Sequence, residues 1–203
     1  HKEYRRQRQM CIRDRLGTLS YAAGNEIYID QVGDGDTINI TQTGSTNKVG
    51  SSTTDAVING GGNTVTIDQV GNNNEVVMSV GTTSGGATVT TSATGDYNSQ
   101  TVACPDCSGS TITSNITGDN NTTSQTLNGG GGKTSNITIT GDYTSVTHTA
   151  SGAGAHNANI TVNSVALSGT PNAISVTQSG ADAQSATVNA SGAGITLNIT
   201  QQP

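Results

Sequence analysis

The 203-residue chain contains no Phe and no Trp, and aromatic residues, all of them Tyr, make up 2% of it. Hydrophobic residues account for 31% and charged residues for 11%, whereas an ordinary globular domain is about 45–50% apolar and about 25% charged. Aromatic rings normally fill much of a core, so a conventional large-residue core is excluded. The sequence also lacks an apolar run of about 18 residues, so we predict no transmembrane helix.

Basic residues are scarce over most of the chain. Six of the eight Lys and Arg residues lie within residues 1–15, and only Lys48 and Lys133 follow them, against twelve acidic residues. Nucleic-acid binding depends on Lys and Arg that neutralise phosphates. We therefore expect no nucleic-acid partner.

The abundant residues are those of strands and turns. The chain contains 27 Gly and is rich in Val, Ile and Thr, and β-branched residues favour strands over disorder. This composition predicts a repetitive β architecture with a thin core of small aliphatic side chains.

The first 15 residues share no pattern with the rest of the chain. Residues 1–15 contain QRQMCIRDR, which resembles a translated sequencing adaptor, and we interpret them as a non-native tail. Residues 16–23 (LGTLSYAA) are interpreted as the remnant of a secretory signal peptide. The alternatives are a basic arm that binds polyanions and an irregular N-terminal cap. Residues 24–203 are predicted to form one repeat domain.

This domain is built from a short repeated frame, and fixed periods of this kind are typical of solenoids. The frame is N-x5-Q-x-G-x-x-[ND], and a degenerate form, x-x-G-x-x-N, continues it where Gln is absent. Its polar positions are Asn25, Gln31, Asp36, Gln42, Asn47, Asn63, Gln69, Asn74, Asn172 and Gln178. Its turn glycines are Gly33, Gly44, Gly71, Gly95, Gly118, Gly141 and Gly180.

Within each half-repeat the side chains alternate with period 2. In NEIYIDQ, Ile27, Ile29 and Gln31 share one face of a strand, and the Gly and Asn residues between strands are turn residues. A strand with two inward apolar residues cannot bury itself, so strand-turn-strand coils must stack about 4.8 Å apart. The pattern predicts an all-β fold, a β-solenoid of about eight coils with about 22–23 residues per coil. Stacked inward Asn and Gln are predicted to form hydrogen-bonded amide ladders.

The segment NEIYIDQVGDGDTINITQ (25–42) resembles the curlin repeat of curli subunits, the extracellular amyloid fibres of bacterial biofilms. Residues 25–47 and 63–80 match this repeat closely, and residues 172–189 match it fairly. The resemblance implies a fimbria-like subunit that leaves the cell through an outer-membrane secretion pore and stacks on a nucleator subunit or on copies of itself. The chain departs from the repeat in three inserts, residues 50–62, 81–86 and 128–133, which are expected to disturb the register.

The two ends of the repeat domain are regular as well. An open solenoid exposes unpaired backbone groups at its terminal coils unless they are capped. The first coil (24–47) and the last strand (194–203) carry no predicted capping helix. Both are predicted to receive another chain.

Cys104-Pro105-Asp106-Cys107 is the one motif with recognisable redox chemistry. A thioredoxin-like site requires a helix after the first Cys, and no helical period is present. A structural zinc site needs four ligands. In a secreted chain we expect a local disulfide between Cys104 and Cys107.

Other catalytic or metal-binding patterns are weak. His148 and His156 are interpreted as exposed strand and loop residues. The acidic turns at residues 34–36, Asp96, Asp119 and Asp142 are interpreted as solvated, with weak Ca²⁺ binding as the alternative. No nucleophile, base and orienting group recur together, so we expect neither an enzyme nor a cofactor or metal site.

Two functions remain. The first is a secreted, self-assembling fibre subunit that acts in adhesion and biofilm matrix. The alternative is a soluble β-solenoid adhesin that binds ice or polysaccharide through outward Thr rows, such as Thr64 and Thr66. Outward positions alternate among Thr, Asn, Asp, Glu and Tyr, which predicts an irregular face and favours the fibre.

Overall fold

The computed structural model describes residues 24–81, 86–105, 109–129 and 131–203. Over these residues the chain is all-β without helix, and it forms a parallel β-solenoid of about seven turns with about 23 residues per turn. The predicted fold class is confirmed. The described residues contain no helix long and apolar enough to cross a membrane. The interpretations of residues 1–15 and 16–23 lie outside the described residues.

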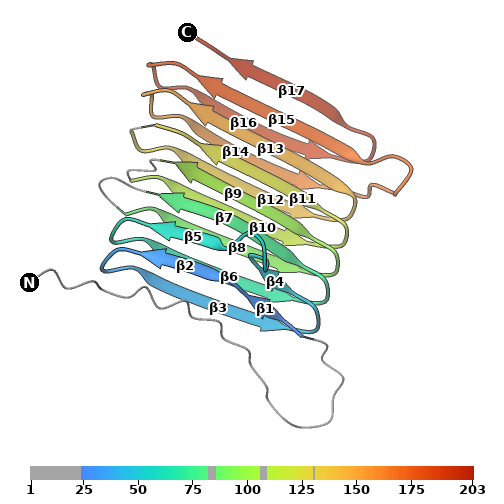
Figure 1. Cartoon of the computed structure of the whole chain (residues 1–203). Helices are drawn as coiled ribbons and strands as arrows, with labels where there is room; N and C mark the ends of the chain where they lie inside the picture. The colour runs from blue at the N-terminus through green and yellow to red at the C-terminus, as the bar shows by residue number, and fades with distance from the viewer. Residues whose placement is uncertain (1–23, 82–85, 106–108, 130) are drawn as a thin grey trace, which may run out of the picture.

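The strands form two parallel sheets that face each other across a narrow interior (Figure 1). In the described residues the ten-stranded sheet comprises β1 (Glu26–Ile27), β2 (Ile29–Val32), β4 (Lys48–Val49), β5 (Ala56–Asn59), β7 (Glu75–Gly81), β9 (Ser99–Pro105), β11 (Thr122–Leu127), β13 (Thr144–Ser151), β15 (Asn172–Ser179) and β17 (Thr196–Gln201). The seven-stranded sheet comprises β3 (Thr37–Thr43), β6 (Thr64–Val70), β8 (Thr88–Thr94), β10 (Thr111–Thr117), β12 (Thr134–Thr140), β14 (Asn157–Asn163) and β16 (Ser185–Ser191). In the first two coils the ten-stranded sheet holds two short strands per coil, β1 with β2 and β4 with β5. From β6 onward the chain alternates between the two sheets, so each strand pairs with its equivalent one coil away.

The register places like positions on like positions along the column. Ile112 of β10 pairs with Val89 of β8 on one side and with Ser135 of β12 on the other. Alternate residues point into the interior, as in β6, where Val65, Ile67 and Gln69 are buried and their neighbours face outward. Because two facing sheets leave little depth between them, Val, Ile and Ala fill an interior in which aromatic rings have no place.

The apolar interior is divided into two clusters. One lies mainly in the N-terminal coils and includes Val65, Val76 and Ile112, while the other lies toward the C-terminus and includes Ile139, Val162 and Ile174. Buried polar residues on β8 to β13 lie beside both clusters, and together they form what we call the polar seam. It comprises Thr91, Gln100, Ser114, Thr123, Gln125, Ser135 and His148.

The chain makes about seven turns where about eight were expected, because two coils are longer than the period. From Asn47 to Asn74 the separation is 27 residues, since residues 50–55 loop out between β4 and β5. Pairing resumes beyond this loop, where Ala56 N donates to Tyr28 O at 2.8 Å. The predicted insert at residues 50–62 is therefore accommodated at one edge of the coil. The predicted inserts at 81–86 and 128–133 lie partly outside the described residues.

A second loop, residues 164–171, was not predicted from the sequence. It connects β14 to β15 and is closed by an isolated bridge between Leu167 and Thr170. Val165 and Leu167 are 76% and 68% exposed on it. The flanking strands keep their register, because Thr144 of β13 pairs with Asn172 of β15.

Candidate assembly site: stacked side chains at the corners and in the core

The corners that lead from the seven-stranded to the ten-stranded sheet share one backbone shape. In the corner Gly95–Asn98, φ is 121° at Gly95 and 58° at Tyr97. A Cβ at Gly95 would collide with the carbonyl oxygen of Gly118 in the next coil. Glycine is required at this position because both the positive φ and the close approach of the coils exclude a side chain. The predicted turn glycines Gly44, Gly71, Gly118 and Gly141 lie at the corresponding position of other coils.

The Asn that closes each of these corners points inward and forms a ladder along the column. The Oδ1 atoms of Asn25, Asn47, Asn74 and Asn98 each accept a backbone N–H from the Asn one coil further on, at 3.0, 3.0, 3.1 and 3.0 Å. Asn47, Asn74, Asn98 and Asn121 are 0–1% exposed. The ladder therefore pairs backbone groups that a tight corner leaves without a strand partner.

The amide nitrogens of the same residues bind the next coil. Nδ2 of Asn74, Asn98 and Asn121 donates to the carbonyl oxygen of Gly95, Gly118 and Gly141 respectively, in each case at 2.7 Å. Each such Asn thus links its own corner to the coil that follows. A buried hydrogen bond of this kind contributes about 1 kcal/mol net, and a buried group left without one costs about 1–3 kcal/mol.

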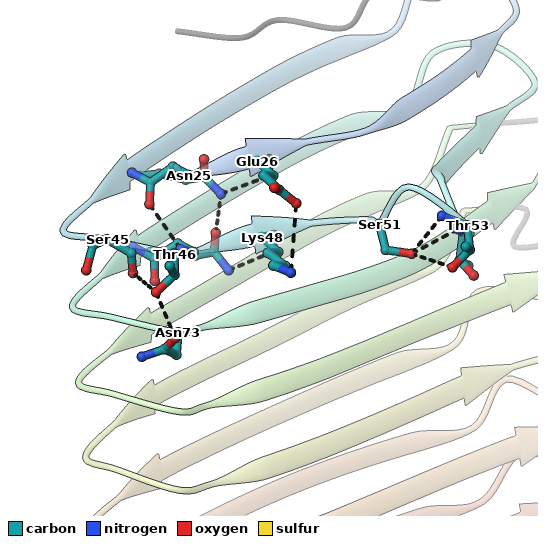
Figure 2. A network of polar contacts seen from close by, with 12 residues as sticks. Asn25, Glu26, Ser45, Thr46, Lys48, Ser51, Thr53 and Asn73 are labelled. Atoms are coloured by element: carbon teal, nitrogen blue, oxygen red, sulfur yellow. Dashed lines mark hydrogen bonds and ion pairs between the residues drawn. The ribbon is translucent and has the colours of Figure 1, made fainter. Parts of the chain in front are cut away.

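The first two coils are joined by further contacts at the surface of this corner (Figure 2). Thr46 Oγ1 donates to Asn73 Oδ1 at 2.7 Å. Lys48 Nζ lies 3.8 Å from Glu26 Oε2, and both side chains are more than two-fifths exposed. Such an exposed ion pair contributes little to stability, so the buried amides carry most of the specificity of this interface.

The ladder is interrupted at Thr144. Thr144 N still donates to Asn121 Oδ1 at 2.9 Å, but the Thr hydroxyl donates to Asp142 O of its own corner at 3.3 Å. The pattern resumes one coil later, where Asn172 Oδ1 accepts from Ile195 N at 2.8 Å. The interruption coincides with the loop at residues 164–171, which enlarges the same coil.

The opposite corners, from the ten-stranded to the seven-stranded sheet, are less uniform. Asp36 Oδ1 accepts from both the backbone nitrogen and Nδ2 of Asn63, at 2.8 and 3.0 Å. Gln31 lies exposed near Asp36 and donates to Asp36 Oδ2 at 2.8 Å. Its register partner is Ile58, so Gln31 makes its hydrogen bonds within its own coil. Gly33 and Gly180 also adopt positive φ at corners of this type.

The inward Gln residues form pairs and also span the interior. Gln42 Nε2 donates to Gln69 Oε1 at 2.8 Å, and Gln178 Nε2 donates to Gln201 Oε1 at 2.8 Å. Gln69 and Gln178 also donate across the interior to backbone carbonyl oxygens of the facing sheet. Each of these amides thus links neighbouring coils and the two sheets.

Several residues with the same role were not singled out from the sequence. Asn98 and Asn121 continue the ladder, and the degenerate frame x-x-G-x-x-N marks both of them. Gln100 and Gln125 donate across the interior to Ser92 O and Thr113 O at 2.8 and 2.9 Å. Their inward phase in the period-2 pattern is the signal that identifies them.

A row of carboxylates lies outside the Asn ladder. Asp119 Oδ1 accepts from Asp96 N, and Asp142 Oδ1 accepts from Asp119 N, both at 2.7 Å. Each carboxylate thus binds a backbone N–H of the preceding coil. Among the described residues no group of three or more His, Cys, Asp or Glu is arranged to hold a metal ion.

The predicted exposure of the two histidines was wrong. His148 and His156 are both 0% exposed, because His148 falls on the inward phase of β13 and His156 occupies the inward corner position before β14. Cys104 is disulfide-bonded and buried, whereas its predicted partner, Cys107, lies outside the described residues.

No family model, curated protein or solved structure matched the chain.

Proposed function

We propose that the chain is a structural subunit of an extracellular fibre, which grows when the coils of one copy stack on the coils of another. The observation that carries this proposal is the repetition of one interface. The contacts of the Asn ladder that join Asn74 to Asn98 are made again between Asn98 and Asn121. A coil of a second copy would offer the same donors and acceptors, so intermolecular stacking needs no new kind of contact.

The first and last described coils have apolar side chains that further stacking would bury. Ile38 and Ile40 of β3 are only partly buried, while Val65 and Ile67, which pair with them from β6, are buried. Leu197 and Ile199 of β17 are partly buried as well. Head-to-tail contact between two copies is a heterologous interface of the kind that produces open filaments.

The curlin resemblance adds the proposed setting. A curli-like subunit is secreted, passes an outer-membrane pore, starts on a nucleator and contributes to adhesion and biofilm matrix. The disulfide at Cys104 supports an oxidising, extracellular compartment. In this proposal the chain has a structural role rather than a catalytic one.

Assembly of the purified full chain tests the proposal. We expect a lag phase, then thioflavin-positive filaments with a cross-β reflection at about 4.7–4.8 Å, and a shorter lag after preformed filaments are added. A chain that stays monomeric in sedimentation at high concentration, with such seeds present, would contradict it.

A matched pair of variants tests the terminal coil. Ile40→Lys places a charge on the inward face of β3, where a stacked coil would bury it at considerable cost, and should strongly slow filament growth. Thr41→Lys places the same charge on the outward face of the same strand and should leave growth close to that of the parent. Circular dichroism of both variants checks that the monomer fold is retained. Equal growth rates for the two variants would argue against stacking at β3.

A second candidate function is favoured by one observation on the seven-stranded sheet. Thr64, Thr88 and Thr111 lie in register on its outer face, and Thr66, Thr90 and Thr113 form a second column beside them. An irregular outward face was predicted from the sequence, partly on the outward residues Glu26, Tyr28 and Asp30. These three residues lie in the first coil on the side of the ten-stranded sheet, so they are not part of the Thr columns. A flat Thr array suits ice or a crystalline polysaccharide. Recrystallisation inhibition and cellulose or chitin pull-down, each lost in Thr90→Lys, would support this candidate.

A further inference from the structure

Three basic side chains lie inside the solenoid in two consecutive coils. Lys133, His148 and His156 are each 0% exposed. Lys133 and His156 occupy equivalent positions of successive coils, because each directly precedes a strand whose first residues, Thr134 and Asn157, pair with each other. Lys133 Nζ donates to the carbonyl oxygen of Gly152 at 2.9 Å. Among the described residues the buried set includes no Asp or Glu, so a proton taken up by a histidine here meets no buried carboxylate.

His148 joins three strands through its two ring nitrogens. Nδ1 lies 2.7 Å from Ser135 Oγ of β12, and Nε2 lies 3.1 Å from Gln178 Oε1 of β15. The Nε2 atom of Gln178 donates to Asn157 O and to Gln201 Oε1, which assigns Oε1 as the acceptor that faces His148. His148 Nε2 is therefore the donor, and Nδ1 accepts from the Ser135 hydroxyl. The neutral imidazole satisfies both partners, whereas the imidazolium would require the Ser135 hydroxyl to turn and accept instead of donate.

The buried groups around His148 are hydroxyl, amide and apolar side chains, and none of the buried described residues is a carboxylate that would pair with a positive charge. Gln125 of β11 and Val176 of β15 flank it in register, and Ser135 faces it from β12. The nearby acidic residues Asp142 and Asp182 belong to corners, where their side chains are partly or fully accessible to water.

These features give a definite direction to the pH response of the fold. Burial lowers the pKa of His148 below its usual value of 6.5; the hydrogen bond with Gln178 raises it, and the charge of His156 lowers it further. When the coil opens, His148 regains the usual pKa and binds a proton more readily than in the closed state. The stability that neutral His148 supports is therefore complete above pH 6.5 and declines as the pH falls from 6.5 toward the lower pKa of the closed state.

The position of His148 decides which part of the molecule responds. It lies in the polar seam, two residues along β13 from Ala150 of one apolar cluster and from Val146 of the other. The side-chain oxygens Thr91 Oγ1, Gln100 Oε1 and Gln125 Oε1 of this seam have no hydrogen-bond partner within the described protein. The seam thus has less apolar packing than the clusters, and repeat proteins open in units smaller than the whole array.

We propose that His148 is an acid-sensitive link in the solenoid, and that its protonation in mildly acidic solution releases the C-terminal coils, from β12 to β15, while the N-terminal coils that contain β6 and β8 stay closed. This inference does not depend on the proposed fibre function, because it concerns opening within one copy. In a fibre it would make the C-terminal half of each subunit the part that acid loosens first.

Amide hydrogen exchange of the full chain, corrected for the intrinsic effect of pH, tests the proposal. Between pH 7.5 and pH 5.0, protection in β12–β15 should fall by up to about thirtyfold, because about 1.5 pH units below the usual histidine pKa change a one-proton equilibrium by that factor. Protection in β6 and β8 should change much less. In His148→Gln, which retains an amide donor and acceptor without titrating, the loss in β12–β15 should disappear, while His156→Gln should retain it. Equal losses in all strands, or equal losses in His148→Gln and the parent, would overturn the proposal.

A direct titration keeps the proposal testable if His148→Gln does not fold. NMR of the imidazole signals in the parent chain, assigned by elimination with His156→Gln and His1→Gln, measures the protonation of His148 in the closed state. A midpoint below the usual value of 6.5 supports the link, and a midpoint at or above it refutes the link. Monomer and filament samples are both suitable for the exchange measurement, because it compares strands of the same molecule.

Discussion

The replacement Asn98→Ala isolates the contribution of one step of the Asn ladder. The side chain is 1% exposed and makes four hydrogen bonds that the variant loses entirely. Nδ2 donates to Asn74 Oδ1 and to Gly118 O, at 3.0 and 2.7 Å. Oδ1 accepts from Asn121 N at 3.0 Å and from Asn121 Nδ2 at 3.2 Å, and that Nδ2 atom also donates to Gly141 O.

The expected cost follows from the groups that lose their partners. Asn74 Oδ1 keeps the backbone N–H of residue 98 as a donor at 3.1 Å, so it remains satisfied. Gly118 O loses the amide that binds it, and Asn121 N loses its acceptor, both in the interior of a corner. At about 1–3 kcal/mol for each of these two groups left without a partner, we expect Asn98→Ala to lower the free energy of unfolding by about 2–6 kcal/mol.

Asn115→Ala provides the matched control. Asn115 lies on β10 with its side chain exposed, and surface substitutions usually change stability by less than about 0.5 kcal/mol. Urea unfolding of the two variants, followed by far-UV circular dichroism, measures the difference. If Asn98→Ala unfolds as close to the parent as Asn115→Ala does, the ladder is not a source of stability and the reasoning fails.

Three further predictions concern single positions. Gly95→Ala should lower the free energy of unfolding in urea by more than about 2 kcal/mol, because the new Cβ meets the backbone of the next coil at a positive φ. In the control Gly81→Ala the new Cβ meets nothing within 4 Å, so its unfolding free energy should stay within about 0.5 kcal/mol of the parent. Similar losses in both variants would contradict the corner geometry. Thr144→Asn should restore the interrupted ladder and raise the melting temperature, by a gain of about 1 kcal/mol for one added hydrogen bond; an unchanged or lower value would show that the enlarged coil cannot accept the amide. Peptide mapping without reduction should link Cys104 to Cys107, and a link between Cys104 and Cys11 would refute the local disulfide.

The fold was predictable because two separate sequence signals in the repeat indicate the same strands and corners. Alternation of inward and outward residues defines each strand, and the Gly-x-x-Asn frame defines each corner, so strand and turn signals agree in nearly every coil. The loop at residues 164–171 escaped prediction because the sequence around it keeps the polar, Ser- and Thr-rich composition of the strands. Its proline, Pro171, directly precedes β15 and was the available signal.

The side-chain stacking was harder to predict because the frame occurs twice in each coil, which hides the sheet to which a residue belongs. Successive half-repeats lie in facing sheets, so Gln31 and Gln42 hold the same position in the frame but belong to different columns. Only residues a whole coil apart stack, as Gln42 and Gln69 do at a separation of 27. The Asn positions escaped this ambiguity in part, because Asn25, Asn47 and Asn74 all directly precede a strand of the ten-stranded sheet.

The polar interior has a physical reason that composition alone does not reveal. A solenoid corner turns the chain so tightly that its N–H and C=O groups lack the strand partners available elsewhere, and an inward amide has both the donor and the acceptor to replace them. Thr144 illustrates the limit of substitution, because its hydroxyl donates only within its own corner. A carboxylate at the Asn98 position would keep the acceptor for Asn121 N but face Gly118 O with a second acceptor. Asn98→Asp should therefore destabilise the chain more than Asn98→Ala at neutral pH, and acid that protonates the carboxylate should narrow the difference between them.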